Sequence, residues 1–507
     1  MKCVDNRLQI SIIVTYFIPF ERFAMFLKTK IRAAVGIVAM AGLSGCMIGP
    51  DYHSPDIKTL LSFHNSEIVK NRAAEMPAPD LSSWWTGFND TLLNSYIDTA
   101  LSQNLDLEQA IARVSQVRAS VQGAKAALLP SGQANAQAAR SRQSLEDPLG
   151  RVLNSTPGYD RDGELYDVNA SASWDLDLFG GLRRNREAAQ AEYQAAKASK
   201  AAVQLSVAAE TADTYVLIRT FQARIKLTQR RIETQQKLVD LVQLQYSRGI
   251  TPELRLSQAQ GALSEVAAAI PALENGLEVS MNALDVLLGT APGTHRTELS
   301  NDIAIPDAPA IDTADGPAEL IRRRPDIIVA ERKLAASNAR IGSEMSEYYP
   351  KLSLMGLIGT STTESGNLFT SGAERALGVV GLRWRLFDFG RVDATVAAAK
   401  GKNAEAMANY RLSILRATAD VENSFSSLVK KESQERKLGE GETAYGKARA
   451  SALSAYKNGA LSLIEVLDAD ERLLRTQDAR VQAKSDATRA AISSFKALGG
   501  GWNSNAS

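Results

Sequence analysis

The chain has 507 residues, of which 45% are hydrophobic and 23% charged, and its formal net charge is +1. This length allows a sizeable core or several domains, and the near-zero charge excludes a general nucleic-acid binder, which would carry a strong basic excess. His53, His64 and His295 all lie in irregular sequence, and neither the HExxH nor the GxSxG pattern occurs. We therefore expect no enzyme, and predict no catalytic residue, no cofactor and no metal site.

The N-terminus has the pattern of a signal peptide over residues 1–45, in which the part before Met25 looks like an over-extended start. Basic residues precede an apolar stretch, Ala33–Leu43, and Leu43-Ser44-Gly45-Cys46 resembles a bacterial lipobox. Cys46 is therefore the predicted lipidation (palmitate) site, and Met47 in place of aspartate favours sorting to the outer membrane. An ordinary small-residue cleavage site is the alternative.

The mature chain begins with an extended segment, 46–90, and no run of about 18 apolar residues follows it. No helix is therefore expected to span a bilayer, so any membrane crossing must be made by strands.

One unit is written twice along the rest of the chain. Trp174–Gly180 matches Trp384–Gly390, and Tyr246–Gly249 matches Tyr456–Gly459, both at an offset of 210 residues. Each repeat is predicted to contain a helix, a β-hairpin and a long helical hairpin. The predicted parts are repeat 1 at 91–288 with its β-hairpin at 131–179, a Pro-rich linker at 289–317, repeat 2 at 318–498 with its β-hairpin at 351–387, and a C-terminal tail at 499–507.

The first β-hairpin is predicted to have the longer loop, around Gln143 to Leu165. After each β-hairpin comes a very long helix. Arg183–Arg248 contains neither Gly nor Pro, and at about 1.5 Å per residue it would make a rod of roughly 100 Å. Asp393–Asn458 is its counterpart, and helices return over Pro252–Leu288 and Leu461–Leu498. An ordinary long coiled coil is the alternative, and the β-hairpins and the duplication weigh against it.

The stretch Asp167–Phe179 alternates strictly, which predicts a strand with one apolar and one polar face. Its apolar residues are Val168, Ala170, Ala172, Trp174, Leu176 and Leu178. The polar residues predicted to line a lumen are Asp167, Asn169, Ser171, Asp175 and Asp177. Open sheet edges are costly in hydrocarbon and four strands cannot close, so copies of the chain would have to share one barrel. A small soluble β-sandwich with one solvated face is the alternative.

Several motifs occur in a characteristic order. They are CMIGPDY from Cys46, Trp84-Trp85, RRRPDIIVAERKLAASNARIG from Arg322, YYPKLSL from Tyr348, LFDFGR from Leu386, NGALSLIEVLDAD from Asn458 and ALGGGW from Ala497. Over nearly all of the mature chain, this set resembles the TolC-like outer-membrane factors, in the efflux lipoprotein (NodT/OprM-type) branch.

The resemblance implies a mostly α-helical chain with a membrane β-barrel. Three copies would form a twelve-stranded outer-membrane barrel that continues into a twelve-helix periplasmic barrel. It further implies a passive exit duct in the outer membrane for small toxic compounds or drugs. An inner-membrane pump of the RND type would deliver these compounds through a periplasmic adaptor. An exit channel for type I protein secretion is one alternative, and a coiled-coil envelope lipoprotein without a pore is another.

The resemblance also implies functional positions at the ends of the helical hairpins. The periplasmic gate would contain Glu465 and Asp468, whose first-half counterparts are Arg255 and Gln258. Under three-fold symmetry these acids would form carboxylate rings that attract cations. The predicted adaptor contacts are the turn residues Arg248, Gly249, Asn458 and Gly459. A solvated helix face and plain helix-capping turns are the alternatives.

Overall fold

A computed structural model describes residues 12–13, 47–56, 62–72, 77–301, 303–312 and 316–503. Cys46 and most of the predicted signal peptide lie outside these residues. The chain forms two compact units. The first contains Met1–Ser54, Gln116–Tyr193 and Arg332–Ala408, and the second contains Pro55–Ser115, Gln194–Glu331 and Asn409–Ser507.

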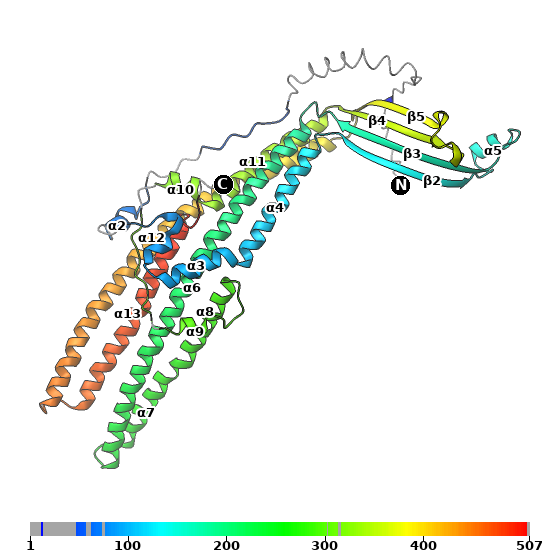
Figure 1. Ribbon diagram of the computed structural model, residues 1–507. Helices are drawn as coiled ribbons and strands as arrows, with labels where there is room; N and C mark the ends of the chain where they lie inside the picture. The colour runs from blue at the N-terminus through cyan, green and yellow to red at the C-terminus, as the bar shows by residue number, and fades with distance from the viewer. Residues whose placement is uncertain are drawn as a thin grey trace, which may run out of the picture. The chain divides into compact units, whose positions relative to one another are not determined.

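An antiparallel meander forms the sheet of the first unit (Figure 1). Its strands are β2 (Ser131–Arg142), β3 (Asp162–Asp175), β4 (Lys351–Thr362) and β5 (Glu374–Arg383). The two-residue strand β1 (Ile12–Ile13) pairs with β5. Among the described residues β2 pairs with β3 alone, so the outer edge of β2 has unpaired backbone N–H and C=O groups.

The strand register gathers the alternating apolar residues on one face of this sheet. Successive strands place Trp174 beside Leu354 and Val380, Ala170 beside Ile358 and Ala376, and Leu352 beside Leu382. Because side chains alternate between the two faces of a strand, these rows all lie on the same side. The predicted apolar face is therefore confirmed, and it extends over β3, β4 and β5.

The two β-hairpins differ in their connections. Residues 143–161 join β2 to β3 and contain α5 (Pro148–Asn154), whereas residues 363–373 join β4 to β5 through the short turns η3 (Ser365–Asn367) and η4 (Ser371–Ala373). The helix α5 begins with Pro148, and the Asp147 side chain accepts a hydrogen bond from the Gly150 N–H. The prediction of a longer loop in the first half is confirmed.

Two helices of equal length follow the β-hairpins. The helices α6 (Gly181–Ser247) and α12 (Arg391–Lys457) each contain 67 residues. Each bound of α12 is 210 residues above the matching bound of α6, so the predicted duplication is confirmed. Within the described ranges, none of the helices combines the length and the apolar character needed to cross a lipid bilayer.

The helix that returns from α6 is interrupted. We predicted one helix over Pro252–Leu288, which is wrong, because α7 (Glu253–Ala267) and α8 (Ala269–Leu287) are separate. Pro271 lacks an N–H and its ring crowds the carbonyl of Ala267, so the helix breaks just before it. The counterpart α13 (Leu463–Ala497) has no proline and runs for 35 residues without a break.

The remaining helices are shorter or connect the repeats. In chain order they are α2 (Ser66–Asn71), η1 (Leu81–Phe88), α3 (Thr91–Gln103), α4 (Leu105–Ala126), α9 (Arg296–Leu299), α10 (Pro317–Arg323), α11 (Pro325–Met345) and η2 (Ser346–Tyr348).

Different residue types fill the cores of the two units. In the second unit the fully buried Trp84 ring stacks on Phe495, with ring centres 5.3 Å apart, and contacts Trp85 and Phe88 edge-on. In the first unit alanines of α6 and α11 pack together. Such small residues allow two helix backbones to approach closely.

Candidate functional site

The two predicted adaptor-contact turns have the same geometry. Gly249 and Gly459 have φ values of +70° and +75°, a left-handed conformation that favours glycine. The Gly249 N–H donates to the Tyr246 carbonyl and the Gly459 N–H to the Tyr456 carbonyl, both at 2.9 Å. Arg248 and Asn458 are exposed beside these glycines. Each turn therefore ends a long helix and presents a short exposed loop.

The two predicted gate acids lie in the first turns of α13. The Glu465 carboxylate accepts from the Ser462 N–H at 2.8 Å and from the Ser462 hydroxyl at 3.0 Å, and the Glu465 N–H donates back to the Ser462 Oγ. This capping box fixes where α13 begins. Asp468 accepts from Arg472 Nε at 3.0 Å, and both side chains are more than 60% exposed. Two exposed carboxylates thus stand one helical turn apart.

The equivalent turn of the first half has no such acids. Its returning helix α7 starts after Pro252, which makes no side-chain cap, and Arg255 and Gln258 occupy the matching positions. Glu253 lies in the first turn of α7, but carboxylates at the two predicted gate positions occur in the second hairpin and not in the first.

Farther along α13, charged side chains form ion pairs with both neighbouring helices, α6 and α12. Arg231 of α6 donates to Glu471 at 2.6 Å, Arg224 to Asp478 at 2.9 Å and Arg489 to Asp213 at 2.7 Å. On the other side α12 contributes the partners of Arg480, which donates to Glu435 at 2.7 Å and to Glu442 at 2.8 Å. The sequence predicted long helical hairpins in this region but not these pairs.

The predicted lumen residues of β3 lie on the polar face of the sheet. Asp167, Asn169 and Ser171 stand opposite Gln137, Asn135 and Gln133 of β2. Asp167 also pairs with Arg375 of β5, with its carboxylate 3.1 Å from the guanidinium. On the same face the middle of β4 and β5 carries the apolar residues Met355, Leu357, Leu377 and Val379, and the strand ends carry Lys351, Ser353, Ser361, Arg375 and Arg383. The run of polar side chains is therefore continuous on β3 and interrupted on the second hairpin.

Asp177 does not belong to this polar face, and the prediction that the strand continues to Phe179 is wrong. The strand β3 ends at Asp175, and Asp177 has a φ of +42°. Its carboxylate accepts from the Leu182 and Arg183 N–H groups, both at 2.9 Å. A carboxylate at a helix N-terminus satisfies unpaired N–H groups and favours the helix dipole, and this requirement overrides the alternation.

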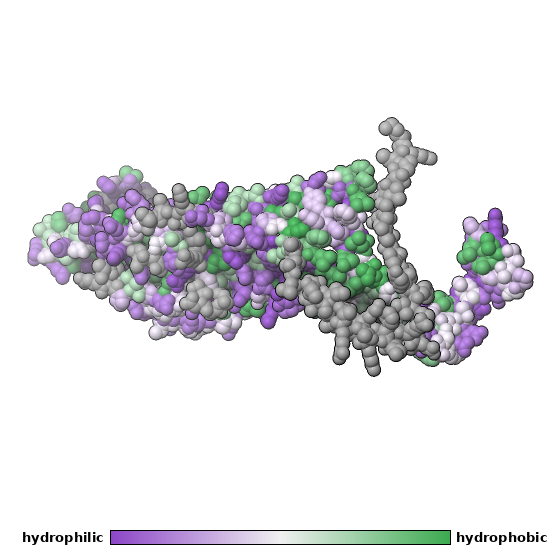
Figure 2. Space-filling view, turned by 90° about the horizontal axis from the view of Figure 1, so that it is seen from above, coloured by the Kyte–Doolittle hydropathy of each residue, from purple (hydrophilic) through white to green (hydrophobic). Residues whose placement is uncertain are grey.

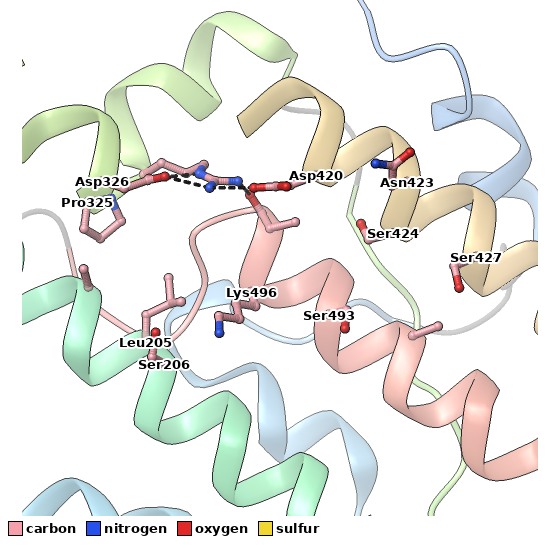
Figure 3. A pocket seen from close by; sticks show the side chains of 14 residues that line it. Leu205, Ser206, Pro325, Asp326, Asp420, Asn423, Ser424, Ser427, Ser493 and Lys496 are labelled. Atoms are coloured by element: carbon pink, nitrogen blue, oxygen red, sulfur yellow. Dashed lines mark hydrogen bonds and ion pairs between the residues drawn. The ribbon is translucent and has the colours of Figure 1, made fainter. Parts of the chain in front are cut away.

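A cavity of about 570 Å³ in the second unit lies among α6, α11, α12 and α13 (Figure 3). Arg324 forms part of its wall and donates to Asp326 at 2.7 Å and to Asp420 at 3.0 Å. Burial opposes the charged form of Arg324, but the hydrogen bonds to these carboxylates outweigh burial and raise the pKa of the guanidinium. The serine hydroxyls and Lys496 that line the remaining surface make the cavity partly polar.

Arg219 is a structural residue that the sequence did not reveal. It lies on α6, is fully buried, and donates to the Leu299 and Asn301 carbonyls at 3.2 and 2.8 Å. Its guanidinium also stands 4.8 Å from the centre of the Tyr215 ring. These acceptors are backbone atoms some 80 residues away, so no local pattern indicates them.

Comparison with known proteins identifies the family. Residues 96–290 and 316–500 match the family described as "Outer membrane efflux protein". The chain belongs to this family. The match occurs twice, once in each repeat, in agreement with the duplicated fold.

Similar proteins include a named export protein and a solved outer-membrane channel. Nodulation protein T of Rhizobium leguminosarum bv. trifolii is 31% identical, over 91% of this chain and 96% of its own. The pyoverdine export outer membrane protein OpmQ of Pseudomonas putida is 30% identical, over 83% of this chain and 88% of its own. The structure of the outer-membrane channel OprN is similar with a TM-score of 0.79 and 30% identity, covering 90% of this chain and 100% of that one.

These findings confirm the predicted family, fold family, function and location. This outer membrane efflux protein is a TolC-like channel component of the outer membrane that extends into the periplasm. As the outer-membrane component of an efflux pump it acts together with other parts of that pump.

Proposed function

We propose that three copies of this efflux protein assemble into one passive exit duct for small toxic compounds. The observation that carries the proposal is the incomplete sheet. The strands β2–β5 have a continuous apolar face, as lipid contact requires, yet the outer edge of β2 is unpaired among the described residues. In hydrocarbon each unpaired backbone group costs several kcal/mol, so the sheet needs further strands.

The opposite edge of the sheet would also need a partner in the mature chain. The strand β1 covers only Leu382 and Gly381 of β5, and it comes from the predicted signal peptide. Removing that peptide would open β5 as well. Three copies would then join β5 of one to β2 of the next and close a twelve-stranded barrel, wide enough for an open lumen.

Exposed apolar side chains on the helices support the same assembly. Val279, Val286 and Leu415 are 58%, 62% and 67% exposed in the single chain, and hydrophobic residues are visible on the surface among hydrophilic ones (Figure 2). Apolar surface of this kind favours contacts with other protein surfaces. We assign it to the contacts between copies in the helical part of the trimer.

Specific residues receive roles within this trimer. We assign Asp167, Asn169, Ser171 and Asp175 to the lumen of the barrel, and no longer Asp177. The gate is assigned to Glu465 and Asp468, and the adaptor contacts to the exposed turns at Arg248, Gly249, Asn458 and Gly459. The ion pair between Asp468 and Arg472 would temper the charge of the carboxylate ring.

The N-terminal part is proposed to anchor the chain. Cleavage after residue 45 would leave Cys46 acylated in the outer membrane, followed by the N-terminal segment 46–90. The prediction that this whole segment is extended is wrong, because it contains α2 and η1. The residues 289–317 would form an equatorial linker between the two repeats, at 91–288 and 318–498.

We further propose an RND-type inner-membrane transporter and a periplasmic adaptor as partners. The relative OpmQ is named for export of pyoverdine and not of a protein, which favours small compounds over type I protein secretion.

Two measurements on the full chain test the proposal. The mass of the purified protein in detergent should correspond to three copies, and it should conduct ions in planar bilayers. Deleting the gene should raise the sensitivity of the cell to toxic compounds, while proteins that are normally secreted should still reach the medium. A stable water-soluble monomer, or a deletion that blocks protein secretion alone, would contradict it.

A further inference from the structure

The first residues after Cys46 occupy a built site in the first unit. The Ile48 N–H donates to the Phe179 carbonyl at 3.2 Å. Arg184 of α6 donates to the Ile48 carbonyl at 3.1 Å and to the Gly49 carbonyl at 3.0 Å, and Asn338 of α11 donates to the Pro50 carbonyl at 2.9 Å. Three consecutive carbonyls of the segment are thus held by side chains from two helices.

Glycines make the close approach possible. A Cβ atom on Gly49 would lie 2.3 Å from the Gly342 Cα, and one on Gly342 would lie 2.6 Å from the Ile48 carbonyl oxygen. A Cβ on Gly180 would meet Met47 at 2.8 Å. Any larger residue at these positions would displace the segment.

Arg184 is buried, and most of its hydrogen-bond acceptors belong to the N-terminal segment. Its side chain is only 1% exposed, and besides the two carbonyls it binds Asp51 and Glu187, both at 2.8 Å. Placing a guanidinium out of water is costly unless its N–H groups are satisfied. Three of these four acceptors belong to the segment 48–51, so releasing the segment would leave a buried cation largely unsatisfied.

We propose that Arg184, Asn338 and Gly342 form an N-terminal clamp, a docking site for the acylated amino terminus of the mature chain. The clamp rests on the acylation that we propose for Cys46. Met47 packs on Gly180, close behind the end of β3, and consecutive Cα atoms are about 3.8 Å apart. The clamp would therefore hold the acyl chains near the end of the sheet, whereas an unattached N-terminal segment would leave them free to move away from it.

This placement has a consequence for assembly. Acyl chains enter a bilayer without any help from the strands. A lipid that is fixed beside the sheet brings the strands to the membrane surface before they pair with other copies. Insertion of the strands then follows an anchoring step that has already raised their local concentration at the membrane. The clamp is thus a positioning device for membrane insertion.

The test compares Arg184→Gln with Arg186→Gln in the full-length chain expressed with its own leader. Arg186 lies on the same helix and is exposed, so the control removes the same charge. Hydrogen exchange of the peptide 47–52 should accelerate about tenfold or more in Arg184→Gln, since hydrogen bonds to a charged group are lost, and stay unchanged in Arg186→Gln. The yield of trimer inserted in the outer membrane should fall in Arg184→Gln alone.

A second variant covers the case in which Arg184→Gln does not fold. Asp51→Asn changes an exposed residue on the segment itself, and it should accelerate exchange by a smaller factor. Unchanged exchange in both variants, or faster exchange with an unchanged yield of inserted trimer, would overturn the clamp.

Metabolic labelling with palmitate separates the clamp from the anchor. All variants should carry the label, since none of them alters the residues before Cys46. A wild-type chain without label would overturn the proposed acylation and the lipid role of the clamp, whatever the exchange data show about the docking of the segment.

Discussion

The two helical hairpins derive from one repeated unit, yet the second adds prominent ion pairs between its two helices. Near the first tip, α6 and α7 join through apolar side chains of Val239, Val242, Leu256 and Ala259. Near the second tip Val466, Leu467 and Leu474 of α13 are buried as well. Farther along this hairpin, α12 and α13 are also linked by Arg480 to Glu435 and Glu442 and by Lys431 to Asp486.

The difference matters because the two kinds of contact respond to different conditions. Burial of apolar surface is non-directional and depends little on ionic strength or on protonation. Partly exposed ion pairs, by contrast, weaken as the salt concentration rises and as acid protonates their carboxylates. The duplication therefore combines one hairpin with an apolar contact at its tip and a second hairpin in which ion pairs add contacts that salt and acid can weaken. The proposed gate acids lie on the second.

Removing apolar volume from the first tip should have the largest effect. Leu256 is 8% exposed within its cluster, so Leu256→Ala should lower the free energy of local opening of α7 by about 2 kcal/mol or more. Hydrogen exchange of α7 measures this opening, and added salt should not change it. Leu254→Ala is the control, because Leu254 is 64% exposed; an equal effect of both variants would show that the cluster does not hold the tip.

Breaking the pair between α6 and α13 should have an intermediate effect. The Arg231 and Glu471 side chains are each 17% exposed, so Arg231→Gln should destabilise the contact by about 1–3 kcal/mol. Exchange in the first half of α13 should rise, and the difference from wild type should shrink at high salt. The exposed neighbour Arg230 provides the control variant Arg230→Gln, which should behave as wild type. A salt-independent loss would rule out an electrostatic contact.

Acid should loosen the second hairpin before the first. Burial raises the pKa of Glu442, but hydrogen bonds from Arg480 and Gln477 outweigh burial and lower the pKa below its ordinary value. A lowered pKa in the folded state means that its stabilisation is complete above the unfolded pKa of about 4.3 and is lost as pH falls through the folded pKa.

Because Glu442 is only partly buried, with 25% of its side chain exposed, its contribution should stay below about 1 kcal/mol. Thermal melting followed from about pH 6 to about pH 3, a range that includes the unfolded pKa of about 4.3, should show a smaller acid-dependent decrease for Glu442→Gln than for wild type. Identical pH profiles would remove Glu442 from the pairing.

The smallest effect concerns the start of α13. Glu465→Ala removes one side of the capping box and should cost about 1 kcal/mol or less, detected as faster exchange at residues 463–466. Glutamine can replace glutamate in a capping box, so Glu465→Gln should keep the helix start while removing the charge. Equal fraying of the two variants would show that the box depends on the charge and not on its geometry.

Much of this fold could be predicted because its patterns are local or periodic. Alternation gave the face of β3 that carries Trp174, and the offset of 210 residues located α12 from α6. The turns at Gly249 and Gly459 followed from Tyr-x-x-Gly, since glycine favours the left-handed conformation that ends a helix.

Other features depended on partners far away in the chain. Arg184 and Arg219 look like surface residues of a long helix, and only their acceptors near residues 48–51 and 299–301 account for their burial. Asp177 continues the alternating pattern in the sequence, but its carboxylate instead accepts hydrogen bonds from N–H groups at the N-terminus of α6. In each case a hydrogen-bonding requirement overrode a correct local pattern.

The most direct test of a cation-sensitive gate at the second tip alone is single-channel current in planar bilayers, with and without a divalent cation. The double variant Glu465→Gln, Asp468→Asn should raise the current or weaken the block, while Arg255→Gln at the matching first-half position should leave both as in wild type. Unchanged current and block in the double variant, or an equal change from Arg255→Gln, would contradict the assignment.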